Sequence, residues 1–188
     1  VSACVLANAI GGVASPSVSI IVPEGVAVEA RPYLEVCNEG IRIEFARRNF
    51  EPEPRDLCIV VDTASKVQLK TGLVQLDKCR NVAVIDHHES RDIEGALLLV
   101  EPQASSTAEL VYYVVKELGH PFSKKELEAL LAGIIYDTKR FLRGTPQTFR
   151  AVAEIIEGGA EYQSALSVQS TAASARTRAS KLARIKCL

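Results

Sequence analysis

The sequence lacks several features that mark common classes of protein. Its 188 residues include no methionine and no tryptophan, and only 5% are aromatic. No apolar run reaches the ~18 residues needed to cross a bilayer. No basic stretch followed by an apolar one opens the chain, as a secretory signal would. The sequence therefore predicts a protein without a membrane segment, which we place in the cytoplasm.

Paired cysteines are also missing. The five cysteines are widely separated and include no Cys-x-x-Cys pair. An odd number at irregular spacing argues against a disulfide framework and against a structural zinc site. We therefore expect reduced, buried thiols, as in other cytoplasmic proteins, at Cys4, Cys37, Cys58, Cys79 and Cys187.

Charge of neither sign dominates, since the formal net charge is −1. This balance gives no general attraction to nucleic acid. Residues 166–188 nevertheless hold five basic residues and no acidic one, so the preceding part of the chain is acidic on balance. Such a separation favours an acidic body, as around a metal site, and a basic tail or linker.

Short β-branched runs alternate with longer amphipathic ones, which is the pattern of βαβ units. We predict an α/β fold with a mainly parallel β-sheet and helices on both faces, followed by a helical segment and a connecting helix. A chain of this length with 47% hydrophobic residues suits one such domain. The predicted strands are 18–22, 41–45, 57–61, 82–85 and 97–100, and early helices are predicted over 2–10, 26–37 and, weakly, 66–76.

The second half of the chain carries clear helix-start signals. Capping boxes open at Ser106 and Ser123, and Thr145 precedes a proline as an N-cap should. Gly119 is a stop signal, and His120 after it is interpreted as a turn residue without a functional role. Three helices are therefore predicted in succession, with a basic connecting helix from residue 168 onward.

Three acidic residues stand out because each interrupts an apolar pattern. Asp62 follows the predicted strand 57–61, and Asp86, with His87 and His88 after it, ends the next strand. Ligands of open α/β sheets bind beyond the carboxyl ends of the strands. Asp137 lies on the inward face of an apolar helix, where an unpaired carboxylate is costly and should meet a cation, a metal or several donors.

These residues together offer carboxylate oxygen and imidazole nitrogen without thiolate, a mixture that suits manganese or magnesium. Two such ions about 3.5–4 Å apart are a common means of hydrolysing phosphate esters. Each residue alone also has a plainer interpretation. Asp62 would be a turn residue, the histidines would be surface residues, and Asp137 would pair with a buried arginine.

The motifs in this order resemble the DHH, or RecJ-like, phosphoesterases. "VIDHHES" resembles the Asp-His-His motif that names the family, "CIVVDTAS" the preceding motif and "GIIYDTKRF" the later one. "SSTAELV" lies between them, and "TPQTFRAVAEIIEGGA" is similar to the family's next helix. The resemblance extends to about residue 165. We therefore expect a catalytic domain over 1–165 and a basic helical linker over 166–188.

The resemblance implies a role for each residue. Asp62 would bridge two metal ions, Mn²⁺ or Mg²⁺, and His87 and Asp137 would ligate one of them. His88 would contact or protonate the substrate phosphate as a catalytic residue. Asp86 would orient the histidines and so take part in catalysis.

Three neighbouring residues have weaker implied roles. Thr138 would support Asp137 through its hydroxyl, and Lys139 and Arg140 would face phosphate unless they lie on a solvated helix face. The family's first motif, an acidic pair before a small-residue helix, is not found, and neither is its C-terminal substrate-binding domain. We therefore expect a fragment that is weakly active or inactive as it stands.

The implied function is metal-dependent hydrolysis of phosphodiester bonds by an exonuclease-like enzyme. Its substrate would be a nucleic acid, an oligonucleotide or a nucleotide. A pyrophosphatase or exopolyphosphatase of the same family is the enzymatic alternative, and a non-catalytic binding or scaffold protein is the other. The buried charges oppose the last, because a degenerate site has no physical reason to keep them. The oligomeric state, including a homodimer, stays open.

Overall fold

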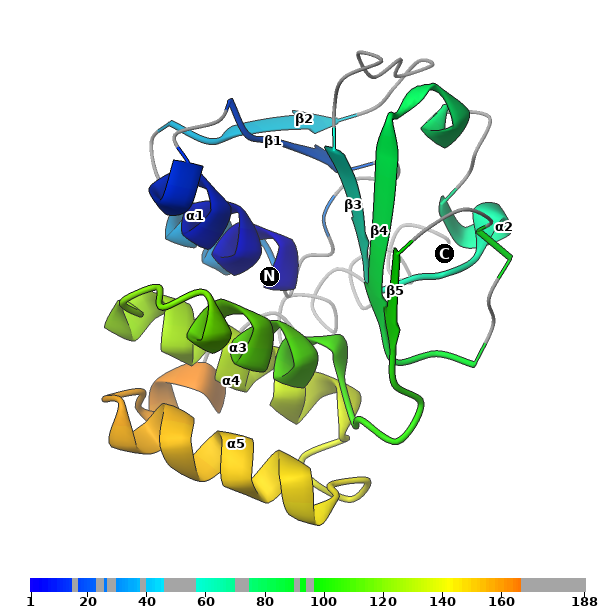
Figure 1. Cartoon of the computed structure of the whole chain (residues 1–188). Coiled ribbons are helices and arrows are strands. Elements are labelled where there is room, and N and C mark those ends of the chain that lie inside the picture. The colour runs from blue at the N-terminus through cyan, green and yellow to red at the C-terminus, as the bar shows by residue number, and fades with distance from the viewer. Residues whose placement is uncertain are drawn as a thin grey trace, which may run out of the picture.

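The computed structural model describes residues 1–14, 17–22, 26, 30–37, 40–45, 57–69, 75–89, 92–93 and 97–166. Strands and helices form a mixed α/β arrangement (Figure 1). Most of the helices lie on one side of the largest sheet, and one short helix lies on the other. The predicted fold class is confirmed.

The strands form two parallel sheets. In the smaller, β1 (Ser19–Val22) pairs with β2 (Arg42–Phe45). In the larger, β4 (Asn81–Asp86) lies between β3 (Leu57–Val61) and β5 (Leu97–Val100). All five agree with the predicted strands to within one residue at each end. Because β3 and β4 are parallel, their carboxyl ends emerge at one edge of the sheet.

Four helices form a layer on one side of the three-stranded sheet, in which α3 packs against β4: α1 (Ser2–Ala14), α3 (Thr107–Glu117), α4 (Lys124–Asp137) and α5 (Pro146–Glu157). The short α2 (Lys66–Leu69) lies on the other side (Figure 1). A 3₁₀ turn over Arg31–Val36 replaces the helix predicted at 26–37, and residues 27–29 lie outside the described part.

The weakly predicted helix, 66–76, is described only as α2 and the start of a 3₁₀ turn at Leu76–Lys78. The residues between them lie outside the described ranges, and so does the predicted connecting helix from residue 168.

The predicted helix caps are largely confirmed. Ser123 and Thr145 each form a reciprocal capping box with the residue three positions later. Ser106 accepts a hydrogen bond from the backbone N–H of Glu109, but the Glu109 carboxylate does not return to it. That carboxylate accepts instead from the hydroxyl of Thr148, so it joins the start of α3 to the start of α5.

The core has two parts, one on each face of the larger sheet. Successive side chains of β4 point to opposite faces and pack into different clusters. Ile85 belongs to the main helical cluster, and Val84 belongs to a smaller cluster with Val60 and Ile93. A strand buried on both faces is expected in a parallel sheet. This burial places the end of β4 between two packed layers.

The cysteine prediction was wrong for two of the five residues. Cys58 in β3 forms a disulfide with Cys79, and their Cα atoms are 6.2 Å apart. The register aligns Cys58 with Val82, so the chain that enters β4 passes beside β3. Parallel pairing therefore brings together two cysteines whose spacing in the sequence gave no sign of it. Cys4 and Cys37 are free, and Cys187 lies outside the described residues.

Candidate metal and phosphate site

Asp62 is held beyond the carboxyl end of β3 by an unusual backbone conformation. Its φ is 70°, in the left-handed region, which aspartate tolerates better than most residues. Its backbone N–H donates to the carbonyl of Ile85 at 3.0 Å, which extends the contact between β3 and β4 by one residue. The exposed Asp62 side chain therefore lies beside the end of β4.

Asp86 ends β4 and is completely buried. Its Oδ1 accepts hydrogen bonds from the backbone N–H of His87 at 2.8 Å and from Nδ1 of His88 at 2.7 Å. Among the described residues, nothing hydrogen-bonds to its other oxygen, Oδ2, although that atom is also buried. A buried carboxylate oxygen without a partner is costly, so this edge of the sheet suits a cation or a water-mediated contact.

Both histidines are oriented through the same ring nitrogen. Nδ1 of His87 lies 3.3 Å from the carbonyl of Ala104, and Nδ1 of His88 faces Asp86. When Nδ1 carries the proton, Nε2 is the nitrogen left for a metal. One ligand atom each from Asp62, His87 and His88 can lie within 4.8 Å of the others. The structure thus brings three of the predicted site residues into one group.

Asp137, the last residue of α4, faces this group from the helical layer. Burial and the charge of Asp62 raise its pKa to about 6, and the two histidines partly offset that rise. The Asp137 carboxylate is not in the 4.8 Å group. It forms no ion pair with any described residue, so the described part of the chain gives no support to a buried arginine partner.

His88 is an exposed member of the site, with 47% of its side chain accessible to solvent. Its hydrogen bond to Asp86 raises its pKa, burial lowers it, and the charges of Asp62 and Asp137 raise it further. The net direction is upward. An exposed imidazole that gains a proton readily can donate a hydrogen bond to a phosphate oxygen.

The turn after α4 carries the predicted phosphate-facing residues. Lys139, Arg140 and Phe141 have φ of 51°, 58° and 69°, a left-handed run without glycine. Buried Thr138 holds it: its hydroxyl donates to the Ile134 carbonyl at 2.7 Å and accepts from the Phe141 N–H at 2.9 Å. Lys139 and Arg140 are exposed on this turn, not on a helix face. Thr138 therefore shapes the backbone that follows Asp137.

The first turn of α5 packs beside the chain that supports His87. Ala104 accepts from the ring of His87, and its neighbour Ser105 hydrogen-bonds to Thr148. Phe149 follows Thr148, and its ring centroid lies 5.7 Å from that of Phe141. These contacts join the α4–α5 turn to the group formed by Asp62, His87 and His88.

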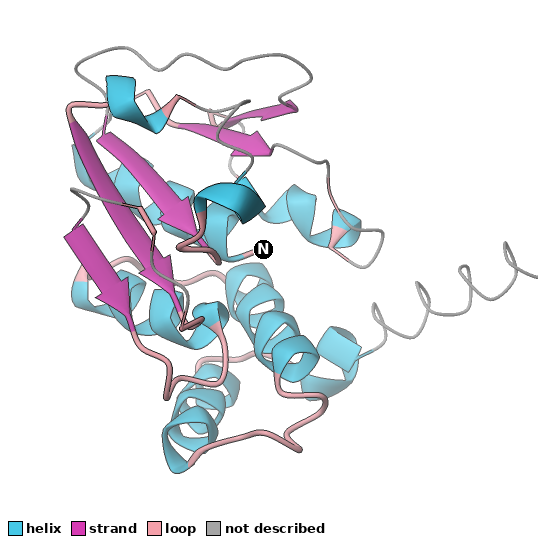
Figure 2. Ribbon diagram, turned by 90° about the vertical axis from the view of Figure 1, so that its right-hand side faces the viewer, coloured by secondary structure: helices cyan, strands magenta, loops and turns pink. Residues whose placement is uncertain are grey.

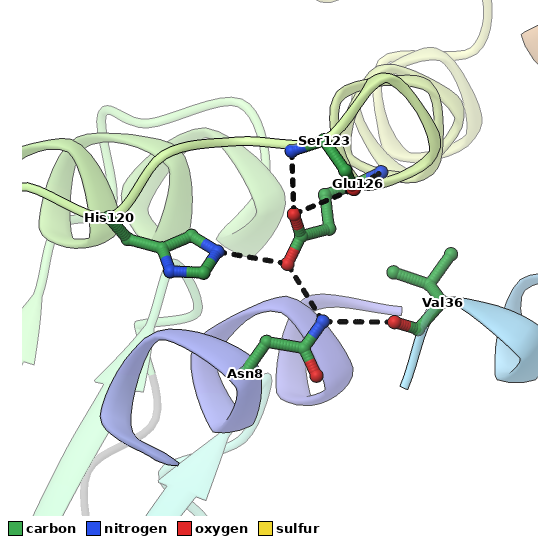
Figure 3. A network of polar contacts seen from close by, with 5 residues as sticks. All are labelled: Asn8, Val36, His120, Ser123 and Glu126. Atoms are coloured by element: carbon green, nitrogen blue, oxygen red, sulfur yellow. Dashed lines mark hydrogen bonds and ion pairs between the residues drawn. The ribbon is translucent and has the colours of Figure 1, made fainter. Parts of the chain in front are cut away.

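Sequence reasoning missed a second polar cluster, which Figure 3 shows. Glu126 is 4% exposed and accepts from Asn8 at 2.7 Å and from His120 at 3.1 Å. Asn8 also donates to the carbonyl of Val36. His120 therefore has a structural partner, although it was interpreted as a plain turn residue. An asparagine within an otherwise small and apolar helix was the one available signal.

Most of the chain matches a known protein family. The family model described as "DHH family, N-terminal domain" matches residues 1–134. The chain belongs to the DHH family.

Several curated proteins resemble this DHH-family chain. The cyclic-di-AMP phosphodiesterase PdeA of Listeria monocytogenes is 36% identical over 143 residues, which cover 71% of this chain and 21% of PdeA. The uncharacterized protein MJ0988 of Methanocaldococcus jannaschii is 32% identical, over 73% of this chain and 40% of that protein. The bifunctional oligoribonuclease and PAP phosphatase NrnA of Bacillus subtilis is 35% identical, over 54% of this chain and 33% of NrnA. The chain thus spans less than half the length of these relatives.

A solved structure supports the fold. An exopolyphosphatase-related protein from Bacteroides fragilis superposes with a TM-score of 0.59 at 17% identity, over 81% of this chain and 54% of that one. At this identity the likeness concerns the fold alone. In the described part of the chain, no helix is both long and apolar enough to span a membrane.

Proposed function

We propose that this DHH domain holds the metal- and phosphate-binding residues of a phosphoesterase that hydrolyses phosphodiester bonds by two-metal catalysis. The group formed by Asp62, His87 and His88 at the carboxyl edge of the sheet carries the proposal. PdeA and NrnA, whose names describe phosphodiester or phosphate-ester hydrolysis, support this class of reaction.

The residues present fit a divalent cation. A carboxylate, two imidazole nitrogens and a nearby carboxylate suit Mn²⁺ or Mg²⁺, and the orphaned oxygen of Asp86 adds negative charge behind them. Asp62, His87 and Asp137 would hold the metal. When bound, such ions activate water and neutralise phosphate oxygens.

The chain's own groups supply the rest of the mechanism. The Asp86 carboxylate accepts a hydrogen bond from Nδ1 of His88 and so fixes the orientation of the exposed imidazole. His88 would donate a proton or a hydrogen bond to a phosphoryl oxygen, which is strongest where negative charge develops. Thr138 sets the turn that presents Lys139 and Arg140, whose charges would attract the phosphate.

We favour a nucleotide or oligonucleotide substrate over pyrophosphate or polyphosphate. Tyr136, next to Asp137, is 61% exposed, and Phe149, against the same turn, is 51% exposed. Exposed rings beside basic residues suit base stacking and phosphate attraction together. Polyphosphate has no base to stack, so these rings would contribute nothing to its binding.

Metal binding is the first test, by calorimetry with MnCl₂ on this chain. We expect saturable binding that Asp62→Asn and His87→Ala abolish. Asp77→Asn is the matched control, because Asp77 is exposed in the turn that enters β4, at the opposite end of that strand from Asp86. Absence of binding in the parent, or an equal loss in Asp77→Asn, would overturn the metal site.

The substrate class is tested separately by equilibrium binding in the presence of Mn²⁺. A fluorescent dinucleotide and pyrophosphate would be titrated into the parent chain and into Tyr136→Ala and Phe149→Ala variants. We expect the variants to weaken dinucleotide binding by about tenfold, the worth of one stacked base, and to leave pyrophosphate binding unchanged. Equal effects on both ligands would refute the nucleotide preference while leaving the metal site intact.

A further inference from the structure

The loop between β5 and α3 carries the carbonyl that orients His87. β5 ends at Val100, and this loop takes the chain from the sheet to α3 in the helical layer (Figure 2). Within the loop, the carbonyl of Ala104 lies 3.3 Å from Nδ1 of His87. A group that fixes this carbonyl therefore also fixes the ring of a predicted metal ligand.

The same peptide group is held from its other end by Glu109. The N–H of Ser105 belongs to the peptide unit that carries the Ala104 carbonyl, and it donates to Oε2 of Glu109 at 3.4 Å. A trans peptide is planar and directs its N–H and its C=O to opposite sides, and the described residues include no cis peptide bond. The Glu109 carboxylate and the His87 ring therefore bind the two ends of one rigid group.

Glu109 is itself held in place at the start of α3. It is 1% exposed, and the same oxygen, Oε2, accepts from the hydroxyl of Thr148 at 3.0 Å. Because this hydroxyl has only one proton to donate, the Ser105 hydroxyl, which also contacts it, must act as the donor to Thr148. Ser105 thus directs both its N–H and its O–H toward the pair formed by Glu109 and Thr148.

The negative charge of Glu109 is buried without a neutralising partner in the part of the chain that the structure describes. Glu109 forms no ion pair with any described residue. The N-terminus of α3 offsets part of the cost of burying this charge. A neutral glutamine could nevertheless accept the same hydrogen bonds at a lower cost. The charge at this position is therefore better explained by its effect on the peptide than by packing.

We infer that Glu109 is a positioning residue for the metal site, which acts on His87 through the peptide between Ala104 and Ser105. A carboxylate that accepts from a peptide N–H polarises the peptide, so that the carbonyl becomes a stronger acceptor. The Ala104 carbonyl then holds the proton of His87 on Nδ1 and leaves Nε2 free to bind a metal. The inference rests on the proposed function for the metal itself, but the state of His87 can be measured without one.

The tautomer of His87 is the first test, because nitrogen-15 NMR distinguishes a protonated Nδ1 from a protonated Nε2 in the metal-free protein. The spectrum is recorded where the ring carries one proton, and loss of the signal in His87→Ala assigns it. We expect the parent chain to be protonated at Nδ1. Glu109→Met, which removes the acceptor at similar side-chain length, should shift His87 toward the mixture of tautomers of a free imidazole. Glu109→Gln, which keeps an acceptor, should stay close to the parent.

Glu126→Met is the matched control. Glu126 is also buried at the third position of a helix, α4, but it accepts from Asn8 and His120 and has no contact with the loop before α3 among its hydrogen bonds. A general loosening of the fold would affect His87 equally in both variants. An unshifted tautomer in Glu109→Met, or the same shift in Glu126→Met, would overturn the inference.

Thr148→Val provides a second variant should Glu109→Met not fold. Valine resembles threonine in shape but can neither donate to Glu109 nor accept from Ser105. It should shift the His87 tautomer in the same direction, and Thr148→Ser, which restores the hydroxyl, should return it toward the parent. A parent-like tautomer in Thr148→Val would then overturn the inference.

Metal affinity, measured by calorimetry with MnCl₂, gives the functional readout. Removing a group that orients a metal-ligating histidine weakens metal binding by about 10–100-fold. Because Glu109 acts through an intervening peptide, we expect the lower limit, about tenfold, in Glu109→Met. A neutral acceptor makes a hydrogen bond about half as strong, so Glu109→Gln should weaken binding by about threefold.

The two measurements separate this inference from the proposed function. A parent chain that binds no Mn²⁺ would overturn the metal site, and the tautomer of His87 would still decide whether Glu109 positions it. A parent that binds Mn²⁺ no more tightly than Glu109→Met would leave the metal site intact and overturn the role of Glu109.

Discussion

Replacing Glu126 by alanine should cost this protein a large part of its stability. The carboxylate closes the capping box of α4 with Ser123 and accepts from Asn8 and His120, which lie on other segments. Losing the box costs about 1 kcal/mol. Each buried donor left without an acceptor costs about 1–3 kcal/mol, at the low end for Asn8, which keeps its bond to Val36.

The free energy of unfolding should therefore fall by about 3–5 kcal/mol, against a total of about 5–15 kcal/mol for a domain. Urea unfolding measures this as a lower midpoint at an unchanged slope. Glu117→Ala, at an exposed position near the end of α3, is the control and should stay within about 0.5 kcal/mol of the parent. A loss below about 1 kcal/mol for Glu126→Ala would show that the network contributes little.

The pH dependence gives a second test of the same carboxylate. Burial would raise the pKa of Glu126, but the hydrogen bonds from Asn8, Ser123 and His120 outweigh it, so the pKa lies below its ordinary value. Its contribution is therefore complete above the unfolded-state pKa of about 4.3 and is lost as the pH falls through the folded-state pKa. Glu126→Gln should lack this acid-side loss, and identical pH profiles would contradict the assignment.

Three further changes have defined outcomes. Because the pKa of Asp137 is about 6 in the folded protein, the unfolding free energy of the metal-free chain should fall as the pH rises from about 4 to 6. Asp137→Asn should then gain about 2 kcal/mol on the parent across that window in urea titrations; a constant difference would refute the shift. Replacing Cys58 and Cys79 by serine should cost about 3 kcal/mol, and dithiothreitol should destabilise only the parent; an unaffected parent would refute this. Gly133→Ala would place its Cβ 2.9 Å from the Cβ of Ala108 and should lower the free energy of unfolding by about 1–3 kcal/mol. Adding Ala108→Gly to the same chain should reduce this loss. An unchanged Tm in Gly133→Ala would show that α3 and α4 can move apart without cost.

Local features of the fold were predictable from the sequence because their causes are local. Four of the five strands are runs rich in β-branched and apolar residues, β2 alternates charged and apolar ones, and the caps at Ser123 and Thr145 involve residues three positions apart. The chemical character of Asp62, Asp86 and Asp137 was also readable, because each acid interrupts an apolar run that folding must bury. The motifs shared with the DHH phosphoesterases added an expected role for each residue.

Contacts between distant segments were decided by the tertiary structure alone. The parallel pairing of β3 with β4 brings Asp62 beside His87 and His88, and the same pairing joins Cys58 to Cys79. The irregular spacing of the cysteines led us to predict reduced thiols. Spacing along the chain carries no information about strand register, which is what brings Cys58 and Cys79 together. Glu109 fits a capping box equally well in sequence, yet its carboxylate turns to Thr148 because α5 packs beside α3.

The sequence by itself thus determined the five strands, most of the helices and the side chains that are candidates for binding a metal. Only the tertiary structure decided which of those side chains meet, which cysteines bond, and that the leucines of β5 lie at an open edge instead of in a core. The physical reason is that propensity, capping and patterning act over a few residues. Register and packing are set by the burial of surfaces that lie far apart along the chain.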